Sequence, residues 1–477
     1  MRYGLLLSIA ITLLACHQEN RTEAREENKP NVLFIYVDDL RPELNIYGAG
    51  HIQSPNIDKL ASQSSLFAKA YCNVPVCGAS RASLLTGLRP AYNRFIDYKT
   101  SAEVEAPGII SLPEQFKNNG YTTVSLGKIF HNFRDYKHAW DTLWRPKRIN
   151  YLTEENIKLS SVKGQRGWPF EMADVPDNVY KDGKTVEVAI AELRRLKDDG
   201  KPFFMGVGFY KPHLGFNAPK KYWDLYDPKE LNVPKSGFRP SNAPEVAFHN
   251  SGELRKYYGI PLEGFVHDSI ATKLVHGYYA CVSYMDALVG SIVSELESLD
   301  LTDNTIIVLC SDHGYNLREH GMWNKHSNFE TSLRVPLIVK VPGSNARHID
   351  EIVENVDIYP TLCDIAGLSK PDHLEGNSML PLINNPKAKS DGIAIAKWFD
   401  GITLVTDNYF YTEWISDQDS VYARMLYDHC TDPMEMNNLS KNPEFQSLVD
   451  SLSALQRLHR GEDFWVEVSR EREPVRW

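Results

Sequence analysis

The chain has 477 residues, enough for one large domain with a smaller one attached, and its 42% hydrophobic and 24% charged residues are ordinary for a globular protein. Its formal net charge of −10 excludes a general nucleic-acid binder, because no global positive field would gather phosphates. An anionic substrate is still compatible with this charge, since a local cluster of basic residues can bind one inside an acidic protein.

The first residues have the pattern of an export signal. Arg2 supplies a positive start, and residues 5–15 are almost continuously apolar but too short to span a bilayer comfortably. The run ends with Leu-Leu-Ala before Cys16, which resembles a bacterial lipoprotein processing site. We therefore expect a lipoprotein signal peptide at 1–15, lipidation of Cys16, and export to a bacterial membrane, on the periplasmic side or at the cell surface. The alternative is a plain secretory signal with an incidental cysteine. Polar residues 16–29 predict a flexible tether.

Strand-like and helix-like patterns alternate through residues 30–385. The expected strands are apolar, β-branched runs at residues 32–37, 121–126, 203–207, 305–310 and 336–341. Helical patterns stand between them at residues 57–66, 112–117, 185–196 and 272–299. This alternation predicts an α/β domain with a mostly parallel sheet covered by helices on both faces. Residues 142–180 and 226–270 are rich in Pro, Asn and charge, and indicate long loops of the kind that carry substrate contacts.

The character of the sequence changes after residue 385. Three short strands and then a helix with a leucine face are expected at residues 392–397, 402–406, 409–414 and 444–458. We therefore place the boundary between a main domain at 30–385 and a C-terminal subdomain of antiparallel strands and a helix at 386–477.

Two pairs of polar residues follow expected strands. Asp38 and Asp39 come after the first strand, and Asp312 and His313 come after the strand at 305–310. Ligands of a doubly wound sheet bind beyond the carboxyl ends of its strands, where adjacent carboxylates repel unless a cation lies between them. Alone, the aspartates could cap a turn and the histidine could be structural. Together the two pairs predict a metal site.

A third segment places a cysteine at the start of a helix. Cys77 is followed by small residues and by Arg81, and the helix-like run continues to Gly87. A nucleophile at a helix N-terminus faces the positive end of the dipole, which suits an anionic substrate. On these residues alone, a redox or structural thiol is an equally open interpretation. The seven cysteines of the chain show no dense disulfide framework.

The cysteine segment resembles the Cys-x-Pro/Ala-Ser-Arg signature of the formylglycine-dependent type I sulfatases, with Ala79 where Pro is commoner. Further segments match that family in its order over nearly the whole mature chain: Gly127-Lys128-Ile129-Phe130-His131, Lys211-Pro212-His213, Ser311-Asp312-His313-Gly314, Glu319-His320-Gly321, Lys325-His326-Ser327-Asn328-Phe329 and Asp357-Ile358-Tyr359-Pro360-Thr361. The Lys-Pro-His motif and the Asp-His pair are especially similar to the iduronate-2-sulfatase branch. The resemblance implies an alkaline-phosphatase-like fold, in agreement with the strand pattern.

The resemblance also implies a cofactor and a nucleophile. The implied calcium ligands are Asp38, Asp39, Asp312, His313 and the oxidised Cys77. Cys77 would be converted to formylglycine by a formylglycine-generating or sulfatase-maturating enzyme. One hydroxyl of the hydrated aldehyde would attack sulfur, and the second would lose its proton as sulfate is expelled.

The remaining catalytic roles are implied in the same way. Arg81, Lys128 and Lys325 would stabilise the anionic oxygens of the sulfuryl group. His131 would orient the diol and accept its proton, and His213 would protonate the leaving oxygen.

Arg94 bears on the substrate. It matches an arginine of the iduronate-2-sulfatase branch that contacts a uronate carboxylate, and a guanidinium fork can pair both carboxylate oxygens. The alternative is a surface or structural arginine. The resemblance implies a sulfated poly- or oligosaccharide substrate with a 2-O-sulfate on or near a uronate, of glycosaminoglycan or ulvan type. The alternatives are a sulfatase of algal galactans such as carrageenan, a phosphatase or phosphodiesterase of the same fold, and an inactive glycan-binding lipoprotein.

Overall fold

The computed structural model describes residues 29–147, 149–234, 238–460 and 462–465. The expected signal peptide, the lipidation site Cys16 and the tether up to residue 28 lie outside these ranges. Within the described ranges, no helix combines the length and the apolar composition needed to cross a membrane.

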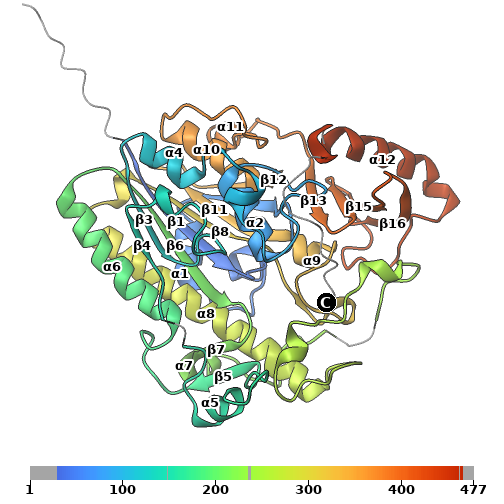
Figure 1. Cartoon of the computed structure of the whole chain (residues 1–477), viewed down its shortest axis with the longest axis horizontal. Coiled ribbons are helices and arrows are strands. Elements are labelled where there is room, and N and C mark those ends of the chain that lie inside the picture. Colours follow the sequence, from blue (N-terminus) through green and yellow to red (C-terminus); the bar gives the residue numbers. More distant parts are fainter. Residues whose placement is uncertain (1–28, 148, 235–237, 461, 466–477) are drawn as a thin grey trace, which may run out of the picture.

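An eight-stranded sheet forms the centre of the main domain (Figure 1). Its strand order is β12-β2-β11-β8-β1-β6-β3-β4. In chain order the strands are β1 (Asn31–Asp38), β2 (Ser65–Tyr71), β3 (Thr122–Gly127), β4 (Thr142–Trp144), β6 (Phe203–Pro212), β8 (Thr305–Ser311), β11 (Arg334–Lys340) and β12 (Arg347–Glu354). Only β11 runs antiparallel to its neighbours, so the sheet is mostly parallel, as the alternating pattern predicted.

The central strand β1 explains why its sequence is continuously apolar. Successive side chains of a strand point to opposite faces, and both faces of this sheet are covered. Phe34 and Tyr36 enter one hydrophobic core, whereas Leu33 and Ile35 enter the other, and none of the four is exposed.

Helices cover both faces of the sheet. One face packs against α1 (Pro55–Ala61), α6 (Lys181–Asp199) and α8 (Asp268–Ser298). The other packs against α2 (Cys77–Thr86), α4 (Leu112–Asn118) and α10 (Ile358–Ile365). The shorter elements are α3 (Ala102–Glu105), α5 (Glu154–Ser160), β5 (Phe170–Ala173), β7 (Phe216–Pro219), α7 (Lys220–Trp223), β9 (Asn316–Leu317), β10 (Trp323–Asn324), α9 (Glu330–Leu333) and α11 (Leu380–Asn384).

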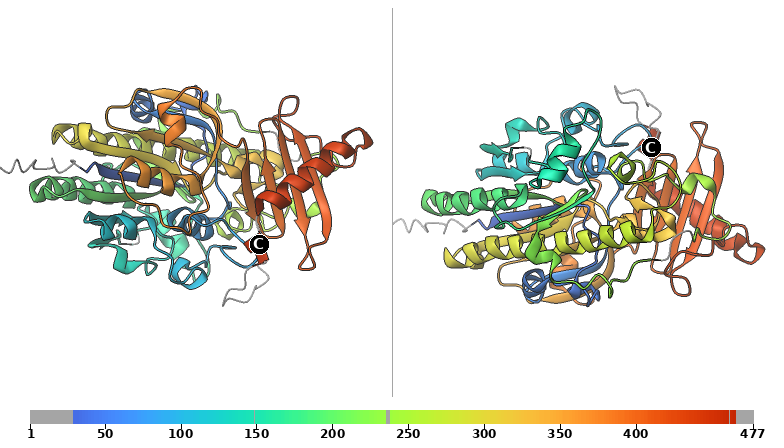
Figure 2. Two further views of the ribbon diagram at one scale, coloured as in Figure 1. Left: turned by 90° about the horizontal axis from the view of Figure 1, so that it is seen from above. Right: turned by 90° about the horizontal axis from the view of Figure 1, so that it is seen from below.

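A second sheet lies at one end of the molecule, with a helix packed across it (Figure 2). It is an antiparallel meander of β13 (Ala394–Trp398), β14 (Gly401–Val405), β15 (Tyr409–Ile415) and β16 (Val421–Asp428). Helix α12 (Gln446–Arg460) buries Val449 and Leu452 against this sheet. The expected leucine face is wrong at Leu458, which is 74% exposed.

The secondary structure differs from the prediction in several places: the expected loop at 142–180 contains β4, α5 and β5, and the C-terminal sheet has a fourth strand, β16. Residues 57–66 were expected to form one helix, but α1 ends at Ala61 and β2 begins at Ser65. The β2 sequence, Ser-Leu-Phe-Ala-Lys-Ala-Tyr, has no β-branched residue and only two aromatic ones, so its local strand signal is weak. Pairing with β11 on one side and β12 on the other makes it a strand, so tertiary contacts override the local preference.

Candidate active site

The carboxyl ends of β1 and β8 bring the two predicted polar pairs together. Asp38, Asp39, Asp312 and His313 are all buried, and one ligand atom from each lies within 4.8 Å of the others. The thiol of Cys77, the first residue of α2, lies within the same distance of Asp38 and His313. Three segments that are far apart in the sequence therefore form one cluster of five residues.

The donor set of this cluster fits a divalent cation. Within the described residues, Asp38 Oδ1, Asp39 Oδ1 and His313 Nε2 are buried atoms without a hydrogen-bond partner. His313 Nδ1 lies 3.0 Å from the carbonyl oxygen of Gly314, which leaves Nε2 for ligation. Buried carboxylate oxygens that accept no hydrogen bond destabilise the fold unless a cation binds them, and oxygen ligands favour a hard cation such as calcium.

Two lysines complete the charge balance of the cluster. Lys128 Nζ lies 2.5 Å from Asp38 Oδ2, and Lys325 Nζ lies 3.1 Å from Asp39 Oδ1. Burial lowers the pKa of both lysines, but the neighbouring carboxylates outweigh it and raise both values above the ordinary one. Both ammonium groups stay charged at neutral pH and can stabilise anionic oxygens in a water-poor site.

Arg81 lies beneath the cluster and is completely buried. Its Nε donates to Asp312 Oδ2 at 2.8 Å, and its Nη1 donates to the carbonyl oxygens of Lys128 and Ile129. The guanidinium lies 4.2 Å from the ring centroid of Tyr36. These contacts make Arg81 an anchor for a predicted metal-ligand carboxylate and for the segment that carries Lys128.

Cys77 occupies an electropositive position. Burial raises the pKa of its thiol, but His131 and Lys128 outweigh burial and hold the pKa well below the usual value. The next residue must be glycine, because a Cβ at Gly78 would lie 2.5 Å from the carbonyl oxygen of Tyr98. A nucleophile at position 77 is therefore stabilised in its anionic form.

Glu253 joins two of the predicted catalytic residues. Its Oε1 lies 3.1 Å from His213 Nε2, and its Oε2 lies 3.0 Å from Lys325 Nζ. Burial and Lys325 lower the pKa of His213, but Asp39 and Glu253 outweigh them and raise it. The sequence carried no signal for Glu253, since a single glutamate in a long polar loop has no distinguishing pattern.

Arg145, just after β4, holds the segment that carries two predicted catalytic residues. Its Nε donates to the carbonyl oxygen of Gly127 at 3.0 Å, its Nη1 to that of His131 at 3.2 Å, and its Nη2 to that of Phe130. These bonds fix the backbone on both sides of Lys128. Nothing in the sequence distinguished Arg145 either.

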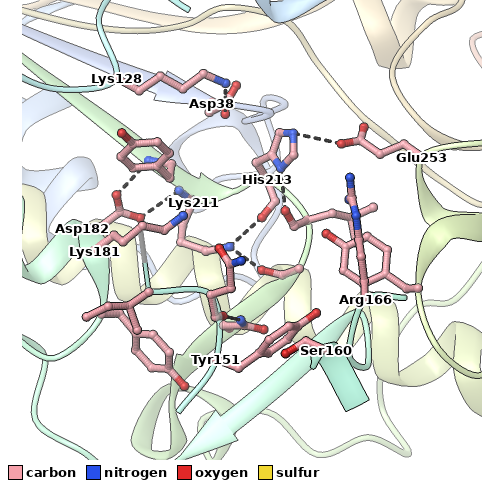
Figure 3. Close-up of a pocket in the computed structure, with 18 of the residues that line it drawn as sticks. Asp38, Lys128, Tyr151, Ser160, Arg166, Lys181, Asp182, Lys211, His213 and Glu253 are labelled. Carbon is pink, nitrogen blue, oxygen red and sulfur yellow. Dashed lines mark hydrogen bonds and ion pairs between the residues drawn. The ribbon is translucent and has the colours of Figure 1, made fainter. Parts of the chain in front are cut away.

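A cavity of about 510 Å³ opens above the cluster (Figure 3). Asp38, Lys128, His131 and His213 line it, as do residues of both long loops that were expected to carry substrate contacts. Arg94 does not line it. Its Nη2 donates to Arg89 O at 2.9 Å and lies 3.2 Å from Glu375 Oε1, so the structure does not bring it together with the other predicted site residues.

A mostly parallel sheet flanked by helices on both faces, with acids at its strand ends and Cys77 at the start of α2, is the architecture of the alkaline-phosphatase-like fold, which the solved structures of sulfatases share. Residues 30–368 match the family model described as Sulfatase, and residues 318–461 match the model described as N-sulphoglucosamine sulphohydrolase, C-terminal. The chain belongs to the sulfatase family and is a sulfuric ester hydrolase.

Several of its relatives are named for sugar substrates. Iduronate 2-sulfatase of Homo sapiens is 35% identical over 94% of this chain and 97% of its own length. An ulvan-active sulfatase of Formosa agariphila is 29% identical over 94% of this chain and 84% of its own length. A solved structure of a 2-O GAG sulfatase has a TM-score of 0.71 at 22% identity, covers 93% of this chain and 95% of the other, and shares the fold.

Proposed function

We propose that the protein removes a 2-O-sulfate on or next to a uronate in a sulfated poly- or oligosaccharide of glycosaminoglycan or ulvan type, with calcium and a formylglycine made from Cys77. The observation that carries this proposal is the buried cluster of Asp38, Asp39, Asp312 and His313 around Cys77, at the base of a cavity with basic walls. The similarity to an iduronate 2-sulfatase and to an ulvan-active sulfatase supports a uronate in the substrate.

The proposed chemistry uses the cluster as follows. Bound calcium would be held by the four ligand side chains and residue 77, and would supply positive charge to sulfate oxygens. The hydrated aldehyde at residue 77 would supply an oxygen nucleophile. Lys128 and Lys325 bind the anionic oxygens and exclude a second cation, since each already neutralises one aspartate.

Two histidines move protons in this scheme. His131 lines the cavity and is the neighbour that does most to lower the pKa of Cys77, so its neutral imidazole would be placed to take a proton from residue 77. His213 lines the same cavity, and Glu253 favours its protonated form, so it can give a proton to the leaving sugar oxygen.

The alternatives differ in what they need from the site. An inactive glycan-binding lipoprotein would have no reason to keep the nucleophile, the ligands and the lysines in one buried cluster. A sulfatase of galactans would need no group that recognises a carboxylate. A phosphatase or phosphodiesterase of this fold usually has a serine or threonine nucleophile and two metals.

We also propose that the protein is exported and lipid-anchored through Cys16, and that a formylglycine-generating or sulfatase-maturating enzyme modifies Cys77. Both proposals rest on sequence motifs.

Desulfation of a panel of defined sulfated oligosaccharides tests the function. We expect release of sulfate from 2-O-sulfated uronides, and much slower release from sulfated galactans of equal size. Turnover of carrageenan oligosaccharides with none of the uronides would overturn the uronate assignment. Turnover of phosphate esters alone would overturn the proposed reaction.

A further inference from the structure

We propose that Arg166 binds the carboxylate of the uronate and so determines the substrate specificity of the site; this rests on the proposed function. Arg166 lies in the loop between α5 and β5 and lines the cavity that contains Asp38, Lys128 and His213 (Figure 3). It occupies the role that the sequence had indicated for Arg94, which does not line the cavity.

The guanidinium of Arg166 interacts with the side chain of Tyr257 but has no acid partner in the described ranges, so it can still bind an anionic ligand. Among the residues that the structure describes, no carboxylate lies within ion-pair distance of it. The other arginines near the site are committed: Arg81 pairs with Asp312, and Arg145 bonds carbonyl oxygens. A cationic side chain that lines an enclosed cavity without an acid beside it is suited to an anionic group of the substrate.

Glu253, the carboxylate that most affects Arg166, is already paired with other cationic side chains. Burial lowers the pKa of Arg166, but Tyr257 and, to a smaller extent, Glu253 raise it above the ordinary value. The two oxygens of Glu253 face His213 at 3.1 Å and Lys325 at 3.0 Å. Glu253 therefore does not compete strongly for the guanidinium, and the local charge at Arg166 stays positive.

Tyr257 holds Arg166 in place. The guanidinium carbon lies 4.9 Å from the ring centroid of Tyr257, and the backbones of the two residues form a parallel β-bridge. Tyr257 is buried. A guanidinium held against an aromatic ring keeps its N–H edge for hydrogen bonds, and an arginine ordered before binding loses less entropy when the ligand arrives.

A carboxylate is the anion that fits this arginine best. The planar fork of a guanidinium matches two coplanar oxygens, as in a uronate carboxylate. The cavity of about 510 Å³ has room for one or two sugar rings. A sugar whose sulfate reaches Lys128 can then place its acid against Arg166.

The test compares a 2-O-sulfated uronide with its methyl ester, which keeps the ring and the sulfate but removes the carboxylate charge. Wild-type enzyme should prefer the acid in kcat/KM by about 10- to 100-fold, the value of a charge-assisted hydrogen bond. Arg166→Gln should lose this preference, mainly through a higher KM for the acid. Lys163→Gln makes the same charge change on the same loop outside the cavity lining and should keep the preference.

The outcomes separate the two proposals. Equal turnover of acid and ester by wild-type enzyme, or an unchanged preference in Arg166→Gln, overturns the role of Arg166 and leaves the uronide sulfatase standing. Equal turnover by the wild-type enzyme overturns the role of Arg166 even where the variant does not fold. Turnover of sulfated galactans without either uronide overturns the proposed function, and the role of Arg166 with it.

Discussion

Replacing Arg145 by Met should slow the reaction although Arg145 is not expected to touch the reacting atoms. The side chain donates to the carbonyl oxygens of Gly127, Phe130 and His131, and so fixes Lys128 and His131. Methionine has similar length and no donors. The backbone on both sides of Lys128 would gain freedom although Arg81 still bonds Lys128 and Ile129, and Lys128 Nζ would be held less firmly beside Asp38.

The magnitude follows from the three contacts. A hydrogen bond from a charged donor contributes about 1.5–3 kcal/mol when both partners are buried. Arg145 is only partly buried, and burial of its charge lowers its pKa, so water would replace part of the loss. We expect about 2–3 kcal/mol less transition-state stabilisation, which is a decrease of about 30- to 150-fold in kcat.

The assay measures kcat and KM for an aryl sulfate and for a sulfated uronide, with the melting temperature as a check on folding. If Lys128 and His131 lose their fixed positions, kcat should fall by a similar factor for both substrates, and KM should change less. Arg134→Met removes an exposed arginine from the same region and should behave as wild type. A folded Arg145→Met variant with wild-type kcat would show that these three hydrogen bonds do not position Lys128 and His131 for catalysis.

Further predictions concern the cluster and its neighbours. An active preparation should show the aldehyde mass on the Cys77 tryptic peptide, and Cys77→Ser should keep its melting temperature and lose turnover; full activity with unmodified Cys77 would exclude formylglycine. Chelation should abolish activity, and added calcium should restore it. Elemental analysis of Asp312→Ala should show loss of bound metal, and normal metal content in that variant would place the metal site elsewhere. Glu253→Gln should lower the pKa of His213, because the Glu253 carboxylate raises it, and should therefore move the alkaline limb of the pH profile of kcat/KM to lower pH. An unmoved limb would contradict the pairing of Glu253 with His213. Native protein should sediment with membranes and Cys16→Ala should not, so unlipidated native protein in the medium would contradict the anchor.

The parts of the site that could be predicted are those at strand ends. Asp38 and Asp312 follow apolar runs that can only be buried strands, and parallel strands bring their carboxyl ends to one edge. The resemblance added Cys77 and the lysines, because their motifs are continuous in sequence.

The parts that could not be predicted depend on contacts between distant segments. Glu253, Arg145 and Arg166 lie in loops without periodic pattern, and only the folded chain brings them to the cavity. Strand β2 was missed for the same reason, since its pairing with β11 and β12 determines its conformation.

The burial of α2 has a consequence for the order of events in the life of the protein. Every residue of that helix is buried, and Cys77 is 4% exposed. Ser80 Oγ donates to the carbonyl oxygen of Asp312, which directly follows the distant strand β8. On the proposed chemistry, a modifying enzyme must bind the cysteine segment as an extended chain, before β8 has joined the central sheet. Oxidation would then come first, closure of the sheet second and metal loading last. A chain that folds too early would keep its thiol for good, so the yield of active enzyme would depend on a race between modification and folding.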